Sequence, residues 1–391
     1  MLRRNVLRVA GGGVIFAALP AALSGCNPAM PPEAIAAWQG PPATETDVRR
    51  WALSWAILAP HSHNLQSWIV DLSRPGEIVL RCDLTRLLPQ TDPFSRQIMM
   101  SQGTFLELLD LAARERGQRC EIELFPEGAF GPERLDQRPV ARIRLVPDAT
   151  VARDALFAQI PRRHTNRSVY DPARPVPAAA WQALAAAVAP HPLRLGWIGP
   201  DAADGPALLA RHRAVADEAW RIELTTPRTI MESYQVLRVG AAEVAQHRDG
   251  LTILDAKVEW LARLGLLDRA RPPAPDSYAT TSQIDDFRAK LASTPGFFWM
   301  VTDGNDRATQ VNAGRAYARV QLAATALGLA VHPLQQALQE YPEQAGPHAA
   351  VRALLGATSA AQTVQMWARI GHAPEVGPAP RRALADFIRA G

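Results

Sequence analysis

Lysine is nearly absent from the sequence, because Lys257 and Lys290 are the only two among 42 basic residues. Neither lies in a motif typical of catalysis, so nothing indicates Schiff-base chemistry. An excess of charge of one sign is missing as well, since 38 acidic residues nearly balance the basic ones. The near balance argues against a nucleic-acid-binding protein.

Cysteine is scarce, with Cys26, Cys82 and Cys120 as the three residues of this type. Their spacing does not match that of a zinc site. In an oxidising compartment Cys82 and Cys120 could pair, but two buried free thiols fit the sequence equally well. The pairing stays open.

The first 25 residues are typical of an export signal. A cationic stretch with a twin arginine, Arg3–Arg8, precedes an uncharged apolar run over 11–23 that is short for a membrane span. The following "LSGC", which ends at Cys26, is similar to the lipobox of bacterial lipoproteins. We therefore predict twin-arginine export, removal of 1–25, and a periplasmic-side lipoprotein held at the membrane only by acylated Cys26. An uncleaved anchor with a chance Cys is the alternative.

Beyond the signal, residues 26–45 are rich in Pro, Ala and Gly and predict a tether. Helical and strand-like patterns then alternate, which predicts an α+β fold. The expected helices cover about 51–58 and 98–116, and the expected strands cover 68–72, 77–82, 119–125 and 140–146.

Two stretches of the sequence recur. "GTFLELLDLAARERG" (Gly103–Gly117) matches "GRAYARVQLAATALG" (Gly314–Gly328), with Gly at both ends. "AILAPHSHNLQSWI" (Ala56–Ile69) has an echo in "AAVAPHPLRLGWI" (Ala186–Ile198) that lacks the Asn and Gln. We therefore predict two related halves, 46–150 and 151–391. The unequal spacing of the two pairs predicts a helical insertion at 225–294, which would suit a lid.

Two polar clusters are candidates for a site. "APHSHNLQSW" (Ala59–Trp68) concentrates His, Asn and Gln, and "PRRHTNRSVYDP" (Pro161–Pro172) contains Arg, His, Thr and Asn, the components of a phosphate site. A solvated basic turn is the alternative for the second cluster. His61 and His63 also raise the possibility of a metal, but no acid or Cys accompanies them in the loop. No Gly-x-Ser-x-Gly occurs, so a serine hydrolase is disfavoured.

Four motifs together resemble the FMN-dependent nitroreductase superfamily. They are "APHSHNLQSW", "RRHTNRSVYD", "GLAVHPLQQAL" (Gly328–Leu338) and "RIGHAPEVGPAPRRAL" (Arg369–Leu384). The Asn-Gln loop precedes the Arg-rich motif, an order that resembles the Acg-like branch, in which one chain fuses two halves into a pseudo-dimer. The resemblance covers roughly residues 45–391. It implies a nitroreductase-like fold in which each half has a mixed or antiparallel sheet and a long central helix.

The resemblance also implies one FMN site and assigns its residues. The phosphate would be held by Arg163, His164, Thr165, Arg167, Arg381 and Arg382. Asn64 and Gln66 would bond the ribityl chain or the ring edge. Pro333, Leu334, Gln335 and Gln336 would pass beneath the ring, with a backbone N–H near flavin N5. The second pseudo-equivalent site would be vacant. Ser67 stands where the family usually has Pro, and His61 where it often has Ser.

The implied function is an exported FMN-dependent oxidoreductase that passes electrons through flavin N5 to a small organic acceptor of the quinone or nitroaromatic class. Its electron donor is not indicated. The alternative is a non-catalytic protein that stores FMN beneath a lid. Because one chain supplies both halves, we expect a monomer.

Overall fold

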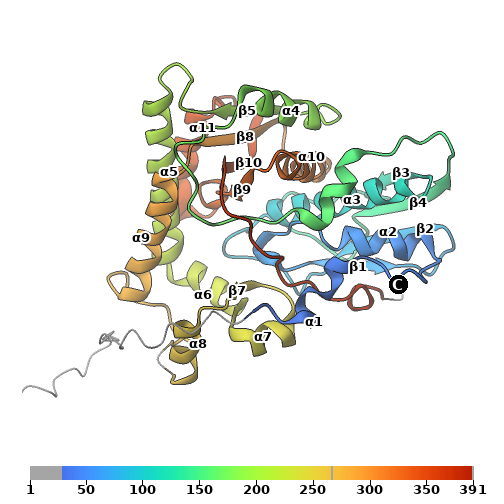
Figure 1. Cartoon of the computed structure of the whole chain (residues 1–391), viewed down its shortest axis with the longest axis horizontal. Coiled ribbons are helices and arrows are strands. Elements are labelled where there is room, and N and C mark those ends of the chain that lie inside the picture. Colours follow the sequence, from blue (N-terminus) through green and yellow to red (C-terminus); the bar gives the residue numbers. More distant parts are fainter. Residues whose placement is uncertain (1–28, 266, 390–391) are drawn as a thin grey trace, which may run out of the picture.

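Two four-stranded antiparallel sheets, with helices between and around them, form the body of the protein (Figure 1). The computed structural model describes residues 29–265 and 267–389, so the predicted signal peptide and Cys26 lie outside the described residues. The first half comprises α2 (Val48–Ala56), η3 (Ser62–Asn64), β1 (Trp68–Asp71), β2 (Glu77–Cys82), α3 (Arg96–Glu115), β3 (Gln118–Leu124) and β4 (Ala141–Pro147).

The second half follows a 3-10 helix, η4 (Ala155–Arg162). Its sheet and covering elements are α4 (Ala178–Val188), β5 (Arg194–Ile198), β8 (Gly296–Asp303), α10 (Arg307–Ala326), β9 (Ala330–Pro333), η5 (Gln336–Leu338), η6 (Pro342–Gln344), α11 (Ala345–Leu354) and β10 (Gln362–Gly371). Between β5 and β8 lie α5 (Gly205–Thr225), α6 (Pro227–Gln235), β6 (Leu237–Val239), α7 (Gly240–His247), β7 (Leu251–Ile253), α8 (Ala256–Arg263) and α9 (Tyr278–Ala292).

The two large sheets have the same topology. Their strand orders are β1-β2-β4-β3 and β5-β8-β10-β9, so in each sheet the fourth strand of the half lies between its second and third strands. In each half a twenty-residue helix, α3 or α10, connects the second strand to the third. This common topology confirms the predicted α+β architecture of two fused halves, each with an antiparallel sheet and a long helix.

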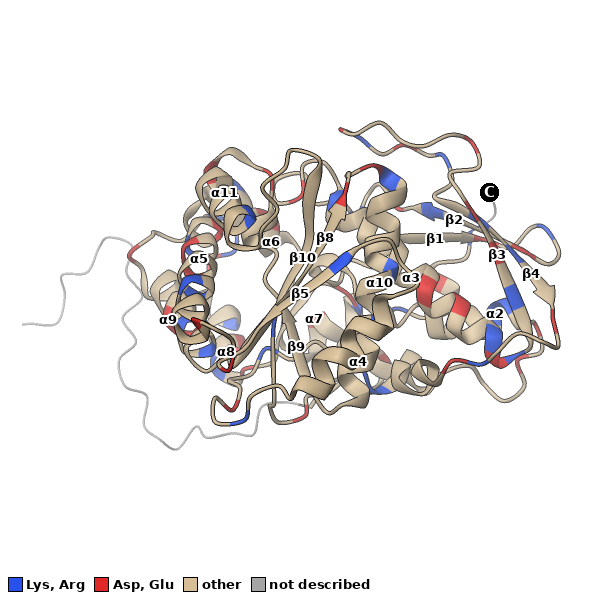
Figure 2. Ribbon diagram, turned by 90° about the horizontal axis from the view of Figure 1, so that it is seen from above, with Lys and Arg blue, Asp and Glu red and all other residues tan. Residues whose placement is uncertain are grey.

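The helices α3 and α10 cross between the two sheets (Figure 2). A Cβ on Gly103 would lie 1.9 Å from the carbonyl oxygen of Val311, and a Cβ on Gly314 would lie 1.9 Å from that of Met100. The glycine of each helix thus contacts the backbone of the opposite helix. In both cases the contact lies three residues before the glycine of that opposite helix. Only residues without a side chain allow this approach, and the reciprocal contacts relate the two helices by a pseudo-two-fold axis.

The ends of these helices are also equivalent. The Asp92 carboxylate accepts hydrogen bonds from the first-turn amides of Gln97 and Ile98 in α3, and Asp306 accepts one from Thr309 in α10. Such caps satisfy amides that have no partner within the helix. Each helix is followed by a left-handed glycine, Gly117 at φ 63° and Gly328 at φ 67°, which ends it.

Apolar residues from both halves make the core continuous. The core of the first half includes Val311, Ala318 and Leu322 from α10. The inner face of the second sheet packs against α4 and α10, and its outer face packs against α5, α9 and α11. The helices α5 and α9 therefore form part of the fold's support, and the two views agree in placing them on the far side of the second sheet (Figures 1 and 2).

The halves differ most between their first and second strands. In the first half residues 72–76 make this connection, and in the second half residues 199–295 do so. The predicted insertion at 225–294 lies inside the second range but leaves out nearly all of α5. The repeat spacing gave the approximate length of the extra segment and could not show that α5 belongs to it.

Both ends of the described chain pack onto the body. Residues 32–39 form α1 (Pro32–Ile35) and η2 (Ala36–Gln39), and Trp38 is buried. A tether over 26–45 does not describe these residues, because apolar side chains in the Pro-rich stretch contact the protein. The C-terminal arm, 372–389, which contains η7 (Leu384–Asp386), returns from the second half to the first, where Val70 and Ile388 form a parallel bridge (Figure 1).

Candidate functional site

The loop before β1 has an unusual backbone. His63, Asn64 and Gln66 have φ values of 48°, 55° and 56°, in the left-handed region that residues with side chains seldom adopt. Strained backbone of this kind persists only where surrounding contacts fix it. The loop is fixed to α3 by the Ser62 amide, which donates to Ser101 Oγ at 3.1 Å, and by Gln102 Nε2, which donates to the Ser67 carbonyl at 2.9 Å.

His61 closes the same loop from inside. Its Nε2 accepts a hydrogen bond from the Ser67 amide at 3.0 Å, and its Nδ1 lies 2.8 Å from the Ser62 carbonyl. Burial lowers the pKa of His61 to about 3, so the ring is neutral and can donate through Nδ1 while it accepts through Nε2. A proline at position 67 would have no N–H to donate. The two departures from the family pattern, His61 and Ser67, therefore bond to each other.

Asn64 and Gln66 hold the loop to two distant segments. Asn64 Nδ2 donates to the carbonyls of Gly250 and Pro380 at 3.3 and 3.1 Å. Gln66 Nε2 donates to the Arg248 carbonyl at 2.9 Å, and Gln66 Oε1 accepts from the Arg382 amide at 3.0 Å. These amides therefore bind the inserted segment and the C-terminal arm, a role that the sequence did not indicate.

Three arginines of the predicted phosphate set are buried without a carboxylate partner in the described chain. Arg163 donates to Gln321 Oε1 and to the Leu58 carbonyl, each at 3.2 Å, and Arg381 donates to the Ala59 carbonyl at 3.0 Å and to Asn64 Oδ1. Arg382 donates to the Gln66 carbonyl at 2.5 Å. The Nε atoms of all three have no hydrogen-bond partner among the described residues. Burial lowers the pKa to about 10, 9 and 10 respectively. Asp249, Asp83 and Asp386 partly offset this effect at Arg382, whereas no carboxylate of the described chain acts on Arg163 or Arg381.

Arg167 differs from these arginines because its side chain is exposed. Within residues 29–265 and 267–389 it forms no hydrogen bond or ion pair, yet desolvation by surrounding protein lowers its pKa. Burial together with the charge of Arg167 lowers the pKa of His63 to about 4, and both also lower the pKa of His332. Arg167 is therefore a solvent-accessible cation near both the first-half loop and β9.

The segment after β9 is held to β10 by the Gln335 side chain, which makes the hydrogen bonds that a strand backbone would make. The Gln335 side chain donates to the Gln365 carbonyl at 3.2 Å and accepts from the Trp367 amide at 3.3 Å. The Leu334 amide donates to the Trp367 carbonyl at 2.8 Å. Gln336 begins η5 and lies near the buried Glu223 of α5, where it partly offsets the rise in pKa that burial causes. Pro333 ends β9 opposite Ala368, so the whole predicted segment follows the edge of the second sheet.

Other residues of the site were missed by the sequence analysis. Trp38 lies against the guanidinium groups of Arg381 and Arg163, at 5.4 and 6.0 Å from its ring centroid, and meets the His164 ring edge-on at 4.9 Å. Arg369 donates to His332 Nδ1 at 2.9 Å and to the Ser168 carbonyl at 2.7 Å, which fixes the backbone beside Arg167. Trp38 stood in the expected tether, and His332 and Arg369 stood inside quoted motifs without an assigned role.

The structure thus brings most of the predicted residues together. The loop, the arginine motif and the C-terminal arm meet around Leu58 and Ala59, and Arg167 connects this region electrostatically with β9. Thr165 is partly exposed and has no side-chain hydrogen bond in the described chain, and His164 Nε2 is buried without a partner there. Their positions leave both free to contact a ligand.

The geometry of the described residues does not support a metal site or a disulfide between Cys82 and Cys120. Among the described residues no group of three or more His, Cys, Asp or Glu could hold a metal ion. Cys82 and Cys120 are free thiols, and burial raises the pKa of both. Within the described chain, no helix combines the length and the apolar character that crossing a membrane requires.

Known proteins are similar to almost the whole chain. No family model matches it. Two proteins from strains of Mycobacterium tuberculosis, provisionally named NAD(P)H nitroreductases, are 28% identical over 370 residues, covering 90% of this chain and 95% of theirs.

Solved structures of nitroreductases are also similar to part of this chain. An FMN-dependent nitroreductase from Mycobacterium smegmatis in complex with NADPH is 19% identical, with 60% of this chain and 96% of that one covered and a TM-score of 0.35. A nitroreductase with bound FMN from Bacteroides fragilis is 14% identical, with 59% and 94% covered and a TM-score of 0.32. The similarity to the M. tuberculosis proteins extends over nearly the whole length of both chains.

Proposed function

We propose that the protein is an FMN-binding oxidoreductase of the nitroreductase type. Bound FMN would supply the redox chemistry, because its ring accepts and releases electrons that protein side chains cannot carry. The chain's own contribution would be to bind the phosphate, to hold the ring and to control access. The observation that carries the proposal is the group of cations without carboxylates around Leu58 and Ala59, joined to Arg167.

The donor set fits a phosphate-bearing cofactor. Buried cations are costly unless they are paired, and in the part of the chain described no carboxylate acts on Arg163 or Arg381, while Arg382 has only the more distant charges of Asp249, Asp83 and Asp386. A phosphate dianion would supply the missing charge. Arg167, His164 and Thr165 have unused donors and would contact it directly, while Arg163 and Arg381, already bonded to backbone carbonyls, would stabilise it mainly through their charge.

The remaining predicted residues divide into two roles. Pro333, Leu334, Gln335 and Gln336 would pass beneath the ring on the rigid edge of the second sheet. The Asn64 and Gln66 amides are occupied by protein carbonyls, so we assign them to positioning the loop.

For the substrates we propose only the chemical class of the acceptor. A small organic acceptor of the quinone or nitroaromatic class would approach the exposed face of the ring, and the donor is left unspecified. Because only the second half contains the Arg163–Arg167 motif, we propose one FMN per chain in a monomeric pseudo-dimer. Export by a twin-arginine signal and acylation of Cys26 on the periplasmic side stay part of the proposal, and an intact Met1 found in membranes by mass spectrometry would contradict them.

Storage of FMN without turnover is the second candidate, and the docking of the inserted segment favours it. Glu232 of α6 accepts hydrogen bonds from the Gln90 and Thr91 amides at 2.8 and 2.9 Å. Asp249 is buried between Arg86, at 2.5 Å, and Arg238, at 2.9 Å. A segment held this firmly beside the loop would restrict access to a bound flavin.

An absorption spectrum of the purified protein, followed by release of FMN from fully loaded material, tests the proposal. We expect a flavin spectrum and one FMN per chain. Absence of binding would contradict both candidates, and two FMN per chain would contradict the single site.

Turnover separates the two candidates. NADPH and a quinone are added under nitrogen to the intact protein and to a variant in which 227–276 are replaced by a Gly/Ser linker. This variant keeps α5 and α9, whose ends are joined by the Trp220 indole hydrogen bond to the Gln283 carbonyl. Reduction that is slow in the intact protein and fast in the variant would indicate a lid, and turnover in neither would favour storage.

A further inference from the structure

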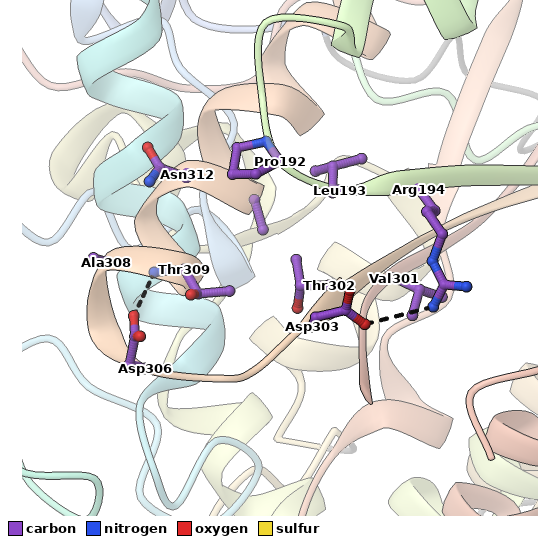
Figure 3. A pocket seen from close by; sticks show the side chains of 11 residues that line it. Pro192, Leu193, Arg194, Val301, Thr302, Asp303, Asp306, Ala308, Thr309 and Asn312 are labelled. Atoms are coloured by element: carbon purple, nitrogen blue, oxygen red, sulfur yellow. Dashed lines mark hydrogen bonds and ion pairs between the residues drawn. The ribbon is translucent and has the colours of Figure 1, made fainter. Parts of the chain in front are cut away.

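A pocket of about 460 Å³ lies in the second half, away from the candidate flavin site. Figure 3 shows Thr309 and Asn312 of α10 on one side of it and Arg194, at the start of β5, on the other. The lining residues are Pro192, Leu193, Arg194, Val301, Thr302, Asp303, Asp306, Ala308, Thr309, Asn312 and Ala313. We call it the Asn312 pocket.

The pseudo-two-fold relation explains why a pocket exists here. The alignment that pairs Gly103 with Gly314 places Asn312 and Ala313 at the positions of Ser101 and Gln102. In the first half Ser101 and Gln102 are covered by the loop before β1, which bonds to both. In the second half the chain continues from Pro192 directly into β5, so the corresponding part of α10 lacks this cover.

The uncovered wall presents hydrogen-bonding groups. The side chains of Thr309 and Asn312, one helical turn apart, form no hydrogen bond with any other described residue, whereas the Thr309 amide is capped by Asp306. An Asn amide offers a donor and an acceptor side by side, which suits an amide or the edge of a heterocycle. Leu193 and Val301 give the pocket apolar surface for a ring.

Charge at the pocket is largely internally compensated. Arg194 pairs with Asp303 at 3.8 Å, which Figure 3 marks, and Asp306 faces the first-turn amides of α10. A charged ligand would therefore find, among the described residues that line the pocket, no side chain of opposite charge that is free of another partner. This favours a neutral ligand over a carboxylate or an ammonium.

We propose that the Asn312 pocket is a second small-molecule site, which takes a neutral planar ring bearing an amide or a neighbouring donor and acceptor. It occupies the region that pseudo-symmetry makes equivalent to part of the flavin site, but it lacks the cationic residues of that site. The proposal goes beyond the proposed function, because it requires neither bound FMN nor turnover.

The test uses 4-fluorobenzamide as the probe, followed by ¹⁹F line broadening with the full-length folded protein. We expect a dissociation constant on the order of 1 mM, typical of so small a ligand. Asn312→Leu should weaken binding about tenfold, because the amide edge loses its partner. Leu193→Trp should abolish binding by filling the pocket. Gln137→Leu, which changes an exposed amide in the first half, is the matched control and should bind like the parent.

Other outcomes would overturn the proposal. One is the absence of line broadening at a probe concentration tenfold above the expected dissociation constant. The others are equal affinity of Asn312→Leu and the parent for 4-fluorobenzamide, and tighter binding of 4-fluorobenzoate or 4-fluorobenzylamine than of the amide. Because Asn312 is only partly buried, its replacement should not unfold the chain, and an unchanged circular dichroism melt verifies this. Unchanged FMN content in Asn312→Leu separates failure of this proposal from failure of the flavin assignment.

Discussion

The two halves share a topology but differ in the segment that precedes the first strand of each sheet. In the first half, residues 59–67 form an irregular loop with left-handed residues, held by His61 and by contacts to α3. In the second half, the echo of this sequence enters β5 at Arg194. The strands and the helix crossing are therefore common to both halves, whereas the candidate site residues are not. One half provides the loop, and the other provides the arginine motif.

The helix crossing is the feature most strongly shared by the halves, so its disruption should have the largest effect. We expect Gly103→Ala and Gly314→Ala each to lower the free energy of unfolding by about 3 kcal/mol, near the upper end for overpacking, because the new methyl group meets backbone rather than a movable side chain. Chemical denaturation measures this. Gly346→Ala, where a Cβ meets nothing within 4 Å, is the control. A large cost at one glycine only would contradict the pseudo-two-fold relation.

The arginine motif tests the difference between the halves. Arg167→Ala should weaken FMN binding by about 1.5–3 kcal/mol, the contribution typical of a hydrogen bond to a charged group. Arg194→Ala, at the echo of the loop in the second half, should leave FMN affinity unchanged. Equilibrium dialysis of both apoproteins measures the two constants. Equal affinities in both variants would remove the basis for placing the phosphate beside Arg167.

Sequence reasoning predicted the duplicated helix because its glycines recur at fixed spacing, and the structure explains that spacing by the contacts of Gly103 and Gly314. It could not predict that Asn64 and Gln66 bond to Gly250 and Pro380, because these partners lie far away along the chain. Trp38 was missed for the same reason. Its Pro-rich surroundings predict a tether locally, and only the packed structure shows its contact with Arg381.

The inserted segment, which only the second half has, should make stability depend on pH. Glu223 of α5 is buried without a cation and accepts a hydrogen bond from Gln339 at 2.7 Å, and burial raises its pKa to about 7. An acid whose pKa is raised in the folded state stabilises fully below its unfolded pKa, near 4.5, and loses that contribution as pH rises through about 7.

We therefore expect the free energy of unfolding of the parent, relative to that of Glu223→Gln, to fall between pH 5.5 and pH 8 by on the order of 2 kcal/mol. The buried histidines, whose pKa burial lowers, raise the stability of both proteins over the same range. The difference arises because a glutamine still accepts from Gln339 and carries no charge at either pH. Glu343→Gln changes an exposed acid paired with Arg228 and should keep the parent's pH dependence. Melting curves at the two pH values measure the effect. An identical pH dependence in Glu223→Gln and the parent would contradict the assignment to Glu223.

The smallest expected effect concerns the loop's hold on the inserted segment. Asn64→Ala removes the donor to the Gly250 carbonyl, and a neutral hydrogen bond contributes about 1 kcal/mol net. The Gly250 amide, which donates to the Asn64 carbonyl at 3.1 Å, should then exchange its hydrogen about fivefold faster as the segment opens more often. Alanine also tolerates φ 55° poorly, whereas glycine adopts it freely, so Asn64→Gly separates the two causes. If the amide is what holds the segment, both variants should accelerate exchange at Gly250, whereas backbone strain alone would leave Asn64→Gly like the parent. Exchange measured by mass spectrometry over 237–253 decides between them, with peptides from β3 as the internal reference, because that strand lies at the opposite edge of the first sheet from β1, which follows the loop.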